Sequence, residues 1–213
     1  MKNKVIAVDG FSASGKGSLC TSLSKILKLP YLNTGALYRA IGLKLKQLDF
    51  HDFENTKKIL EIANDIDFSK LDNPELFTEE IGALASKVAI IPEVREFLLN
   101  LQKEFCNNAD GAILDGRDVG TTICPDAKYK FFITASAEER AKRRYKEMLT
   151  KGIETTYNEI LTKIKDRDYN DLNRKTSPLK KAVDAIEIDT TNLSKEEVLN
   201  TVLKFINTSD FNI

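Results

Sequence analysis

The chain has 213 residues, a length that suits one α/β domain with at most a small insertion. Its 32 lysines and arginines balance its 32 aspartates and glutamates, and a net charge of zero argues against a protein that coats nucleic acid. The hydrophobic content of 42% is too high for a disordered chain. The N-terminus runs directly into an apolar segment, and no stretch is long enough to span a membrane, so we expect a cytoplasmic protein.

The first motif joins an apolar strand, expected over residues 5–8, to a helix. Asp9 ends the strand, and the pattern G-x-x-x-x-G-K follows in Gly10, Phe11, Ser12, Ala13, Ser14, Gly15, Lys16, Gly17 and Ser18. This pattern predicts a loop whose backbone N–H groups and lysine bind the phosphates of ATP. A glycine-rich turn with a surface lysine is the alternative interpretation, and the preceding strand argues against it.

A hydroxyl group of this loop should bind Mg²⁺. It comes at Ser18, one position later than in the strict pattern, because Gly17 follows Lys16. The sequence G-K-G-[ST] resembles the loop of nucleoside monophosphate kinases more than that of GTPases.

Periodicity and breaker residues divide the rest of the chain into alternating helices and strands. Helices are expected over residues 15–29, 34–45, 54–63, 79–89, 92–105, 137–151, 155–172 and 194–206. Further strands are expected over residues 31–33, 112–115, 129–133 and 185–188. This alternation indicates a parallel sheet with helices on both faces. Functional groups should then gather at the carboxyl ends of the strands, where Asp9, Asn33 and Asp115 lie.

Other signals concern helix ends and irregular segments. The helix ends are marked by Pro30, by Thr34 as an N-cap, and by a capping box of Ser194 with Glu197. Residues 66–76 are expected to hold two short strands around a turn, and residues 107–110 a turn. The tail after Asn207 is expected to be loose. The only histidine, His51, should be solvated, and the widely spaced Cys20, Cys106 and Cys124 should be buried or half-buried thiols.

Asp115 closes a strand as a Walker-B acid does, so it is a candidate for holding Mg²⁺ directly or through water. A helix-capping or turn aspartate is the alternative. The next residues, Gly116-Arg117-Asp118-Val119-Gly120, crowd opposite charges between two glycines, which a plain turn would not need. We therefore expect Arg117 and Asp118 to contact a substrate.

A polar stretch near the end of the chain carries four charged residues: Arg167, Asp168, Asp171 and Arg174. Helical spacing of seven would put the first and last on one face. Three arginines lie on the preceding helix: Arg140, Arg143 and Arg144. These residues form either an ordinary ion-paired surface or a lid that covers phosphates and excludes water. The phosphate-binding loop favours a lid, expected over residues 137–178, rich in charge and poor in apolar anchors.

Six blocks occur in order along the chain: the loop of Gly10 to Ser18, Thr34-Gly35-Ala36-Leu37-Tyr38-Arg39, Ser86-Lys87-Val88-Ala89, Val94-Arg95, Asp115 to Thr121, and Arg167-Asp168-x-x-Asp171-x-x-Arg174. Together they resemble bacterial cytidylate kinases, over nearly the whole length of the chain. The resemblance implies a single P-loop kinase domain with a five-stranded parallel sheet, a lid, and a short monophosphate-binding insertion at about residues 60–91.

The family resemblance also implies an activity, the transfer of the γ-phosphate of ATP to CMP or dCMP with Mg²⁺, by a monomer that takes part in pyrimidine metabolism. It implies ATP binding by Gly10 to Ser18, catalysis by Lys16, Arg117 and Arg174, and metal binding by Ser18 and Asp115. CMP would contact Thr34, Arg39, Ser86, Arg95, Arg117, Asp118, Arg167, Asp171 and Arg174. In this set Arg39, Arg117 and Arg174 would hold phosphates, Ser86, Arg95 and Asp118 would face cytosine, and Arg167 and Asp171 the ribose. The Asp189-Thr190-Thr191-Asn192 loop would lie near the adenine.

Two departures from the family pattern are visible. Asn33 stands where the family usually has an aspartate, so a charge near the transferring phosphate is missing. The stretch from Ile66 to Glu80 is shorter than the insertion of longer family members, which puts its small sheet in doubt.

Three other functions remain open at this stage. A kinase of another small metabolite or nucleotide would use the same fold, and the Asp118 and Ser86 positions argue against it. A GTPase would need the guanine-binding motif Asn-Lys-x-Asp, which does not occur. The third alternative is a non-catalytic nucleotide-binding module, in which the basic lid residues and Asp171 would have no evident function.

Overall fold

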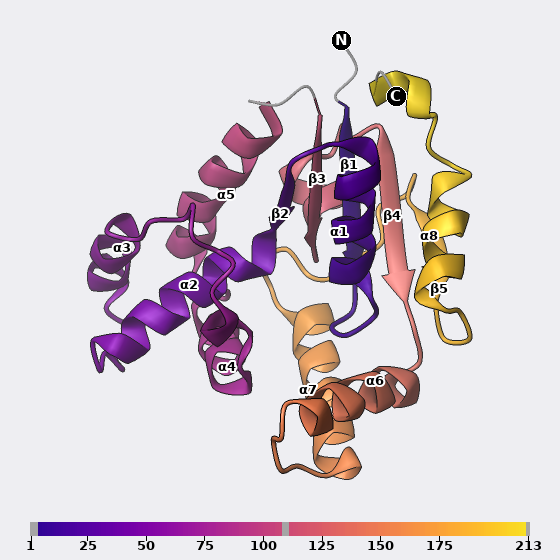
Figure 1. The fold of residues 1–213 in the computed structure, drawn as a ribbon. Helices are drawn as coiled ribbons and strands as arrows, with labels where there is room; N and C mark the ends of the chain where they lie inside the picture. The colour runs from indigo at the N-terminus through magenta and orange to yellow at the C-terminus, as the bar shows by residue number, and fades with distance from the viewer. Residues whose placement is uncertain (1–3, 108–110, 212–213) are drawn as a thin grey trace. The chain divides into compact units, whose positions relative to one another are not determined.

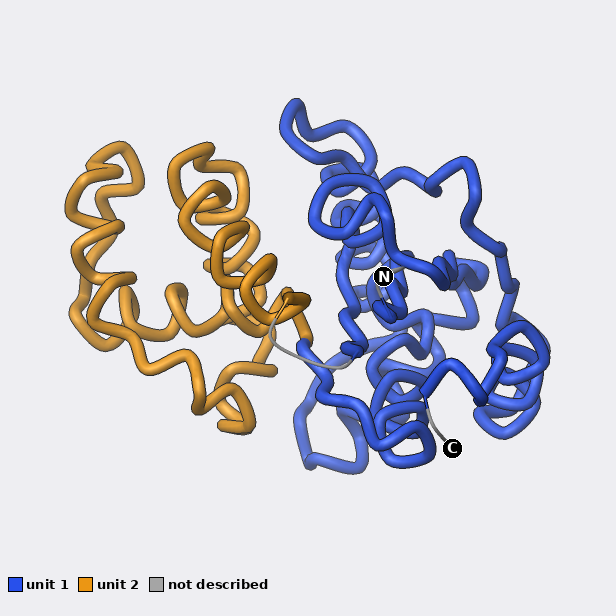
Figure 2. Tube along the Cα trace, turned by 90° about the horizontal axis from the view of Figure 1, so that it is seen from above, with its two compact units in different colours: residues 1–32, 108–213 blue, residues 33–107 orange. Residues whose placement is uncertain are grey.

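The computed structural model describes residues 4–107 and 111–211. The chain divides into two compact units, one of residues 1–32 and 108–213 and the other of residues 33–107 (Figure 2). The insertion expected at about residues 60–91 falls within the second unit. Within the described part of the chain, no helix is both long and apolar enough to cross a membrane.

Five strands form one parallel sheet in the order β2-β3-β1-β4-β5 (Figure 1). They are β1 (Val5–Gly10), β2 (Tyr31–Asn33), β3 (Ala112–Gly116), β4 (Tyr129–Thr134) and β5 (Ile186–Asp189). Every residue of β1 is buried, and this strand has a neighbour on each side in the sheet, β3 and β4. The predicted fold class is confirmed.

In the residues that the structure describes, the first unit also holds four α-helices and two shorter helices. They are α1 (Lys16–Leu27), the π-helix η2 (Val119–Ile123), α6 (Ala137–Thr150), α7 (Tyr157–Asn173), α8 (Lys195–Leu203) and the 3₁₀-helix η3 (Thr208–Phe211). Helices α1 and α8 cover the same face of the sheet, where Leu23 and Val202 join Ile6 and Phe131 in one core cluster. In Figure 1 the strands point downward, and α6 and α7 lie below their carboxyl ends.

Helix α1 and the C-terminal tail differ from what the sequence predicted. Helix α1 ends at Leu27, before the expected residue 29, because Lys28 adopts a left-handed conformation with φ of 50° and its N–H bonds back to the carbonyl of Ser24. The tail is not loose as far as residue 211, since Phe211 is buried against Tyr129, with ring centroids 6.0 Å apart. The capping box of Ser194 and Glu197 is confirmed.

The second unit is helical. Its elements are α2 (Thr34–Gln47), α3 (Thr56–Asn64), the 3₁₀-helix η1 (Pro74–Phe77), α4 (Glu79–Val88) and α5 (Pro92–Asn107). Helices α2 and α4 approach closely at Gly42, where an added Cβ would lie 3.0 Å from Cβ of Leu84. Asn33, and not Thr34, caps α2, because its Oδ1 accepts from the N–H of Ala36 at 3.1 Å.

The expectation of two short strands at residues 66–76 is wrong. Asp67 accepts hydrogen bonds from Ser69, and Asn73 accepts from the N–H of Glu75, so side-chain oxygens close turns where a strand would need extended backbone. Leu76 of η1 then packs in the core cluster of this unit. Asn107 ends α5, and residues 108–110 of the expected turn lie outside the described residues.

The remaining sequence expectations concern single side chains. The three cysteines are free and buried, as expected. His51 is exposed, as expected, and its Nε2 lies 2.8 Å from Oδ1 of Asp49.

Candidate active site

The end of β1 and the loop that follows it turn sharply at three residues. Gly10 has φ of 144°, and a Cβ there would lie 1.9 Å from the carbonyl oxygen of Ile133. Ala13 has φ of 59°, and Gly15, the N-cap of α1, has φ of 97°. Such left-handed residues let a short loop curl its backbone at the helix N-terminus, where N–H groups lack helical partners and favour an anion. The loop therefore has the backbone shape of an anion cradle.

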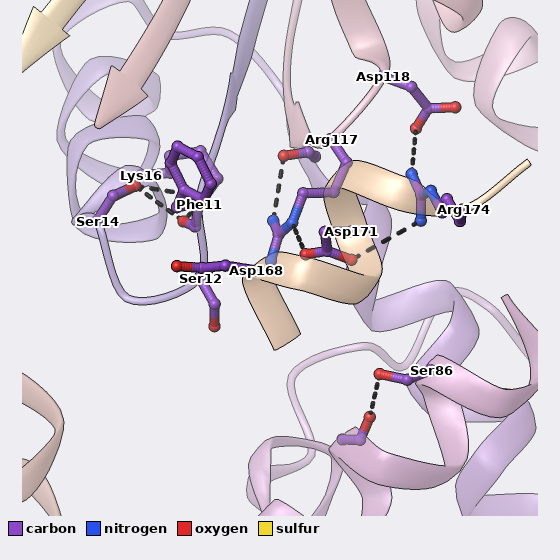
Figure 3. Close-up of polar contacts among 12 residues, drawn as sticks. Phe11, Ser12, Ser14, Lys16, Ser86, Arg117, Asp118, Asp168, Asp171 and Arg174 are labelled. Carbon is purple, nitrogen blue, oxygen red and sulfur yellow. Dashed lines mark hydrogen bonds and ion pairs between the residues drawn. The ribbon is translucent and has the colours of Figure 1, made fainter. Parts of the chain in front are cut away.

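Lys16 is buried at the base of this loop. Its Nζ donates to the carbonyl of Phe11 at 2.5 Å and lies 3.5 Å from Oγ of Ser14, which bonds to the same carbonyl at 2.9 Å (Figure 3). Burial, together with the charge of Arg117, lowers the pKa of Lys16 to about 7. An anion on the loop would favour the charged form of this lysine.

Asp115 lies at the end of β3, the strand next to β1. Its Oδ2 accepts from the hydroxyl of Tyr31 at 3.2 Å and would lie 3.8 Å from a Cβ on Gly17. Burial raises the pKa of this carboxyl, and the charges of Lys16 and Arg117 oppose that rise. Ser18, the other candidate metal ligand, is exposed in the first turn of α1.

These two side chains suit Mg²⁺, which binds through one or two protein oxygens and completes its shell with water and substrate phosphates. Within residues 4–107 and 111–211 no cluster of three or more histidine, cysteine or acidic side chains forms a metal site. Water and the nucleotide would therefore supply the remaining ligands of a magnesium ion held by Ser18 and Asp115.

The two charged blocks of the sequence meet in one network (Figure 3). Nε of Arg117 donates to Oδ2 of Asp171 at 2.7 Å. Arg174 places Nη1 4.0 Å from Oδ1 of Asp171 and Nη2 3.9 Å from Oδ1 of Asp118. The structure thus joins the end of β3 to the end of α7 through alternating positive and negative side chains.

Burial alone would raise the pKa of Asp171, but the charge and hydrogen bond of Arg117, with the charges of Arg167 and Arg174, hold it below its ordinary value. The helical placement of Arg174 is wrong: α7 ends at Asn173, and Arg174 is extended, with ψ of 141°. Its Nε donates to the carbonyl of Ser177 at 2.6 Å, which holds the side chain at the helix end.

The α6–α7 hairpin has its own apolar core of Ala141, Met148, Ile160 and Ile164, which holds its two helices together. Arg140 is buried at its base and forms a two-pronged ion pair with Asp168, at 3.0 and 2.5 Å. The same guanidinium also donates to the carbonyl of Ser12, and it lies 5.1 Å from the ring centroid of Phe11. In this conformation Arg140 anchors the hairpin to the phosphate-binding loop.

A second contact from α6 reaches the loop after β5. Arg143 donates to Oγ1 and to the carbonyl of Thr190, at 3.0 and 2.5 Å. The buried Oγ1 of Thr190 lies 3.1 Å from the carbonyls of both Ser14 and Thr134. The loop expected near the adenine is thus bonded directly to the phosphate-binding loop.

Candidate residues in the second unit lie on α2, α4 and α5. Nη1 of Arg39 donates to the carbonyls of Leu76 and Thr78, at 2.6 and 3.0 Å. Arg95 is 9% exposed and donates to the carbonyl of Ala89 at 3.2 Å. The two remaining candidates are Thr34, buried in the first turn of α2, and Ser86, whose Oγ bonds to the carbonyl of Gly82 at 3.0 Å.

Sequence reasoning placed Asp9 at the strand ends where the site was expected, but it assigned this residue no contact or role. Its carboxylate accepts the N–H groups of Val119 and Gly120, at 2.8 and 2.7 Å, and only 4% of the residue is exposed. Burial raises the pKa of Asp9 to about 6, although these two hydrogen bonds oppose the rise. The available signal was an acidic residue in the buried register of a strand end, directly before the phosphate-binding loop.

A phosphate-binding loop after the central strand of a parallel sheet, with arginines at the same edge, defines a P-loop kinase. A sugar kinase from Janibacter is similar in fold alone, with a TM-score of 0.50 and 14% identity over 98% of both chains. Sequence comparison is more specific. The family model described as cytidylate kinase matches residues 6–208.

Individual relatives agree with the family match. Cytidylate kinases from Bartonella henselae and Fusobacterium nucleatum are each 44% identical to this chain, over 97% of it and over 95% and 98% of their own lengths. The cytidylate kinase of Clostridioides difficile is 42% identical over 97% of this chain and 100% of its own. The chain belongs to the cytidylate kinase family.

Proposed function

We propose that this protein transfers the γ-phosphate of ATP to CMP or dCMP and releases ADP with CDP or dCDP. One observation carries the proposal. In a member of the cytidylate kinase family, the complete phosphate-binding loop and the Arg117–Asp171–Arg174–Asp118 network lie at the ends of two paired strands, with Asp9 opposite Gly116. A phosphate donor and a phosphate-bearing acceptor therefore have cationic binding groups at one edge of the sheet.

On the donor side, residues Gly10 to Ser18 bind the phosphates of ATP. Lys16 stabilises the charge that develops on the transferring group, because a buried cation aimed at that charge acts with little screening. Ser18 and Asp115 hold Mg²⁺, which when bound neutralises charge on the β- and γ-phosphates. Residues Asp189 to Asn192 lie near the adenine.

On the acceptor side, each role follows from a match to the family pattern. In the first unit, Arg117 and Arg174 bind phosphate, Asp118 contacts cytosine, and Arg167 and Asp171 contact the ribose. In the second unit, Arg39 binds phosphate, Ser86 and Arg95 contact cytosine, and Thr34 contacts CMP. Transfer needs no covalent intermediate with the protein, since positioning and electrostatic stabilisation supply most of phosphoryl-transfer catalysis.

The hairpin of α6 and α7, within residues 137–178, acts as the lid that excludes water. Its own core lets it move as one body, and its anchors at Arg140 and Arg143 connect that movement to the loops that bind ATP. Hydrogen exchange with and without ATP plus CMP tests this role. Added protection in α6 and α7 is expected, and none would exclude a lid there.

We also propose that the protein acts as a monomer in the cytoplasm, within pyrimidine metabolism. Its three free cysteines are consistent with a reducing compartment. Light scattering of the purified protein tests the oligomeric state directly.

An acceptor panel tests the activity itself. ADP release from ATP and Mg²⁺ is measured with CMP, dCMP, UMP, AMP and simple sugars in turn. Release that depends on CMP or dCMP is expected. Faster release with another acceptor would indicate a different metabolite kinase, and ATP binding without release for any acceptor would indicate a non-catalytic module.

A further inference from the structure

Asp118 occupies the N-cap position of η2, where aspartate commonly caps a helix with its own side chain. The carbonyl of Asp118 accepts from the N–H groups of Thr122 and Ile123, at 2.9 and 3.2 Å. Its carboxylate forms no capping hydrogen bond with η2, every residue of which the structure describes. Instead Oδ1 of Asp118 lies 3.9 Å from Nη2 of Arg174 (Figure 3).

The side chain that caps η2 is Asp9, which lies at the end of β1. Oδ1 and Oδ2 of Asp9 each accept one N–H group, from Val119 at 2.8 Å and from Gly120 at 2.7 Å. These are the first two N–H groups of η2, and a helix cannot satisfy them internally. The acceptor stands 110 positions earlier in the chain than Val119, at the end of β1.

The fit around this cap is close. A Cβ on Gly120 would lie 3.4 Å from Oδ2 of Asp9 and 3.3 Å from Cδ of Lys130, so the glycine admits both side chains. Nζ of Lys130 in turn bonds to the carbonyl of Pro125, just beyond η2, and to Asp184 at 2.8 Å. Both ends of the η2 segment are therefore held by buried charged groups.

We propose that Asp9 is a positioning residue for base recognition: by capping η2 from β1, it keeps the Asp118 carboxylate turned to the acceptor side. This inference rests on the proposed function, in which Asp118 accepts a hydrogen bond from the cytosine amine. Buried N–H groups seldom stay unsatisfied, because the lost hydrogen bond has a large free-energy cost. Without Asp9, the carboxylate of Asp118 is the acceptor adjoining η2 in sequence. If Asp118 capped η2, one of its carboxylate oxygens would no longer be available to accept a hydrogen bond from the cytosine amine.

Asp9 also adjoins Gly10, the first residue of the phosphate-binding loop. One strand end thus sets the position of the donor loop through the backbone and of the base-reading segment through a side chain. Because Asp9 itself contacts neither nucleotide in this scheme, its replacement should change acceptor selection more than affinity for ATP.

The test compares wild type with Asp9→Asn, whose amide oxygen can accept from only one of the two N–H groups. The kcat/KM values for CMP and UMP and the KM for ATP are measured in both proteins. Wild type is assayed first, since absence of CMP-dependent turnover there would refute the proposed function and not this inference. Asp9→Asn is expected to lower the CMP-to-UMP ratio of kcat/KM about tenfold, the effect of leaving one buried donor unsatisfied. The KM for ATP is expected to stay within about twofold of wild type.

A double-mutant cycle with Asp118→Asn separates positioning from general damage. If Asp9 acts through Asp118, adding Asp9→Asn to Asp118→Asn should not reduce the CMP-to-UMP ratio further. Additive effects on that ratio would overturn the proposal. So would an unchanged ratio in Asp9→Asn.

The matched control is Asp210→Asn, which removes a carboxylate that Lys128 and Tyr129 contact in the same unit, away from the loops of the site. It should leave the CMP-to-UMP ratio at the wild-type value even if it lowers the melting temperature. If Asp9→Asn does not fold, Asp9→Ser gives the same comparison, because its single hydroxyl oxygen can accept at most part of the cap. An equal loss of the ratio in Asp210→Asn would show that instability alone changes selectivity, and would refute the inference.

Discussion

Nε of Arg117 donates to Oδ2 of Asp171 at 2.7 Å, so one ion pair joins the end of β3 to helix α7. The side chains are only 18% and 15% exposed, which places them among the groups whose loss is costly. Asp171 thereby orients an arginine that is proposed to bind phosphate, in addition to its own proposed contact with the ribose.

Replacing Asp171 with Asn should weaken the use of CMP, because Arg117 would keep its place beside a weaker, neutral acceptor. We expect kcat/KM for CMP to fall by an amount that corresponds to about 1–3 kcal/mol of transition-state stabilisation. Asp166→Asn, an exposed carboxylate on the same helix, is the matched control and should match wild type. Steady-state kinetics with all three proteins checks this, and equal kcat/KM values would show that the pair is dispensable.

Binding of ATP at pH 8 should take up protons. Lys16 has its pKa lowered to about 7 by burial and by Arg117, so the nucleotide-free protein holds it mostly neutral at pH 8. Phosphates on the loop raise that pKa again and draw a proton from solution, up to about one per site. Calorimetry in two buffers of different ionisation enthalpy measures the uptake, and Lys16→Met should lose most of it. Proton release, or no dependence on the buffer, would contradict the assigned contact.

Asn33→Asp should leave the fold intact and change turnover more than CMP binding. Oδ1 of Asn33 caps α2, and an aspartate can accept the same hydrogen bond while adding charge at a helix N-terminus, worth about 0.3–1 kcal/mol. The melting temperature should therefore be equal or slightly higher. Because the residue ends β2 and is expected to face phosphates, kcat should respond. A large change in CMP affinity at constant kcat would contradict this placement.

The strands were predictable because continuous apolar runs between breakers leave few alternatives in a parallel sheet. The segment at residues 66–76 was not, since Asp67 and Asn73 close turns through side-chain hydrogen bonds that periodicity does not reveal. The capping of α2 by Asn33 illustrates the same limit at single-residue scale, as Thr34 fits the pattern equally well.

Of the candidate site, the motif residues were predictable because their chemistry depends on local spacing. The contacts that hold them were not, because they join distant parts of the chain. Asp9 reaches Val119, and Arg140 reaches Asp168, only once the sheet and the hairpin have formed. Arg174 was misplaced because helical spacing alone does not show that α7 ends at Asn173, one residue before it.

Asp118→Asn should relax the choice of base. An ionised carboxylate only accepts hydrogen bonds, which suits the cytosine amine and disfavours the uracil carbonyl, whereas an amide offers both functions at nearly the same volume. We expect kcat/KM for CMP to fall by an amount that corresponds to about 1–3 kcal/mol of transition-state stabilisation. The kcat/KM for UMP should fall by less, or rise. Kinetics with both acceptors decides it. Equal losses of kcat/KM for CMP and UMP would mean that Asp118 has a structural role, as a partner of Arg174, and that other residues recognise cytosine.

Transfer of label is the most direct test of the central claim, that this protein moves the γ-phosphate of ATP onto CMP. ATP labelled at the γ-phosphorus is incubated with Mg²⁺, CMP and either wild type or Lys16→Met, and the products are separated. The account predicts label in CDP, in amounts equal to the ADP formed, and almost none with Lys16→Met, since the charge it supplies to the transferring phosphate is lost. Label found only in inorganic phosphate, or label in CDP at the wild-type rate with Lys16→Met, would contradict it.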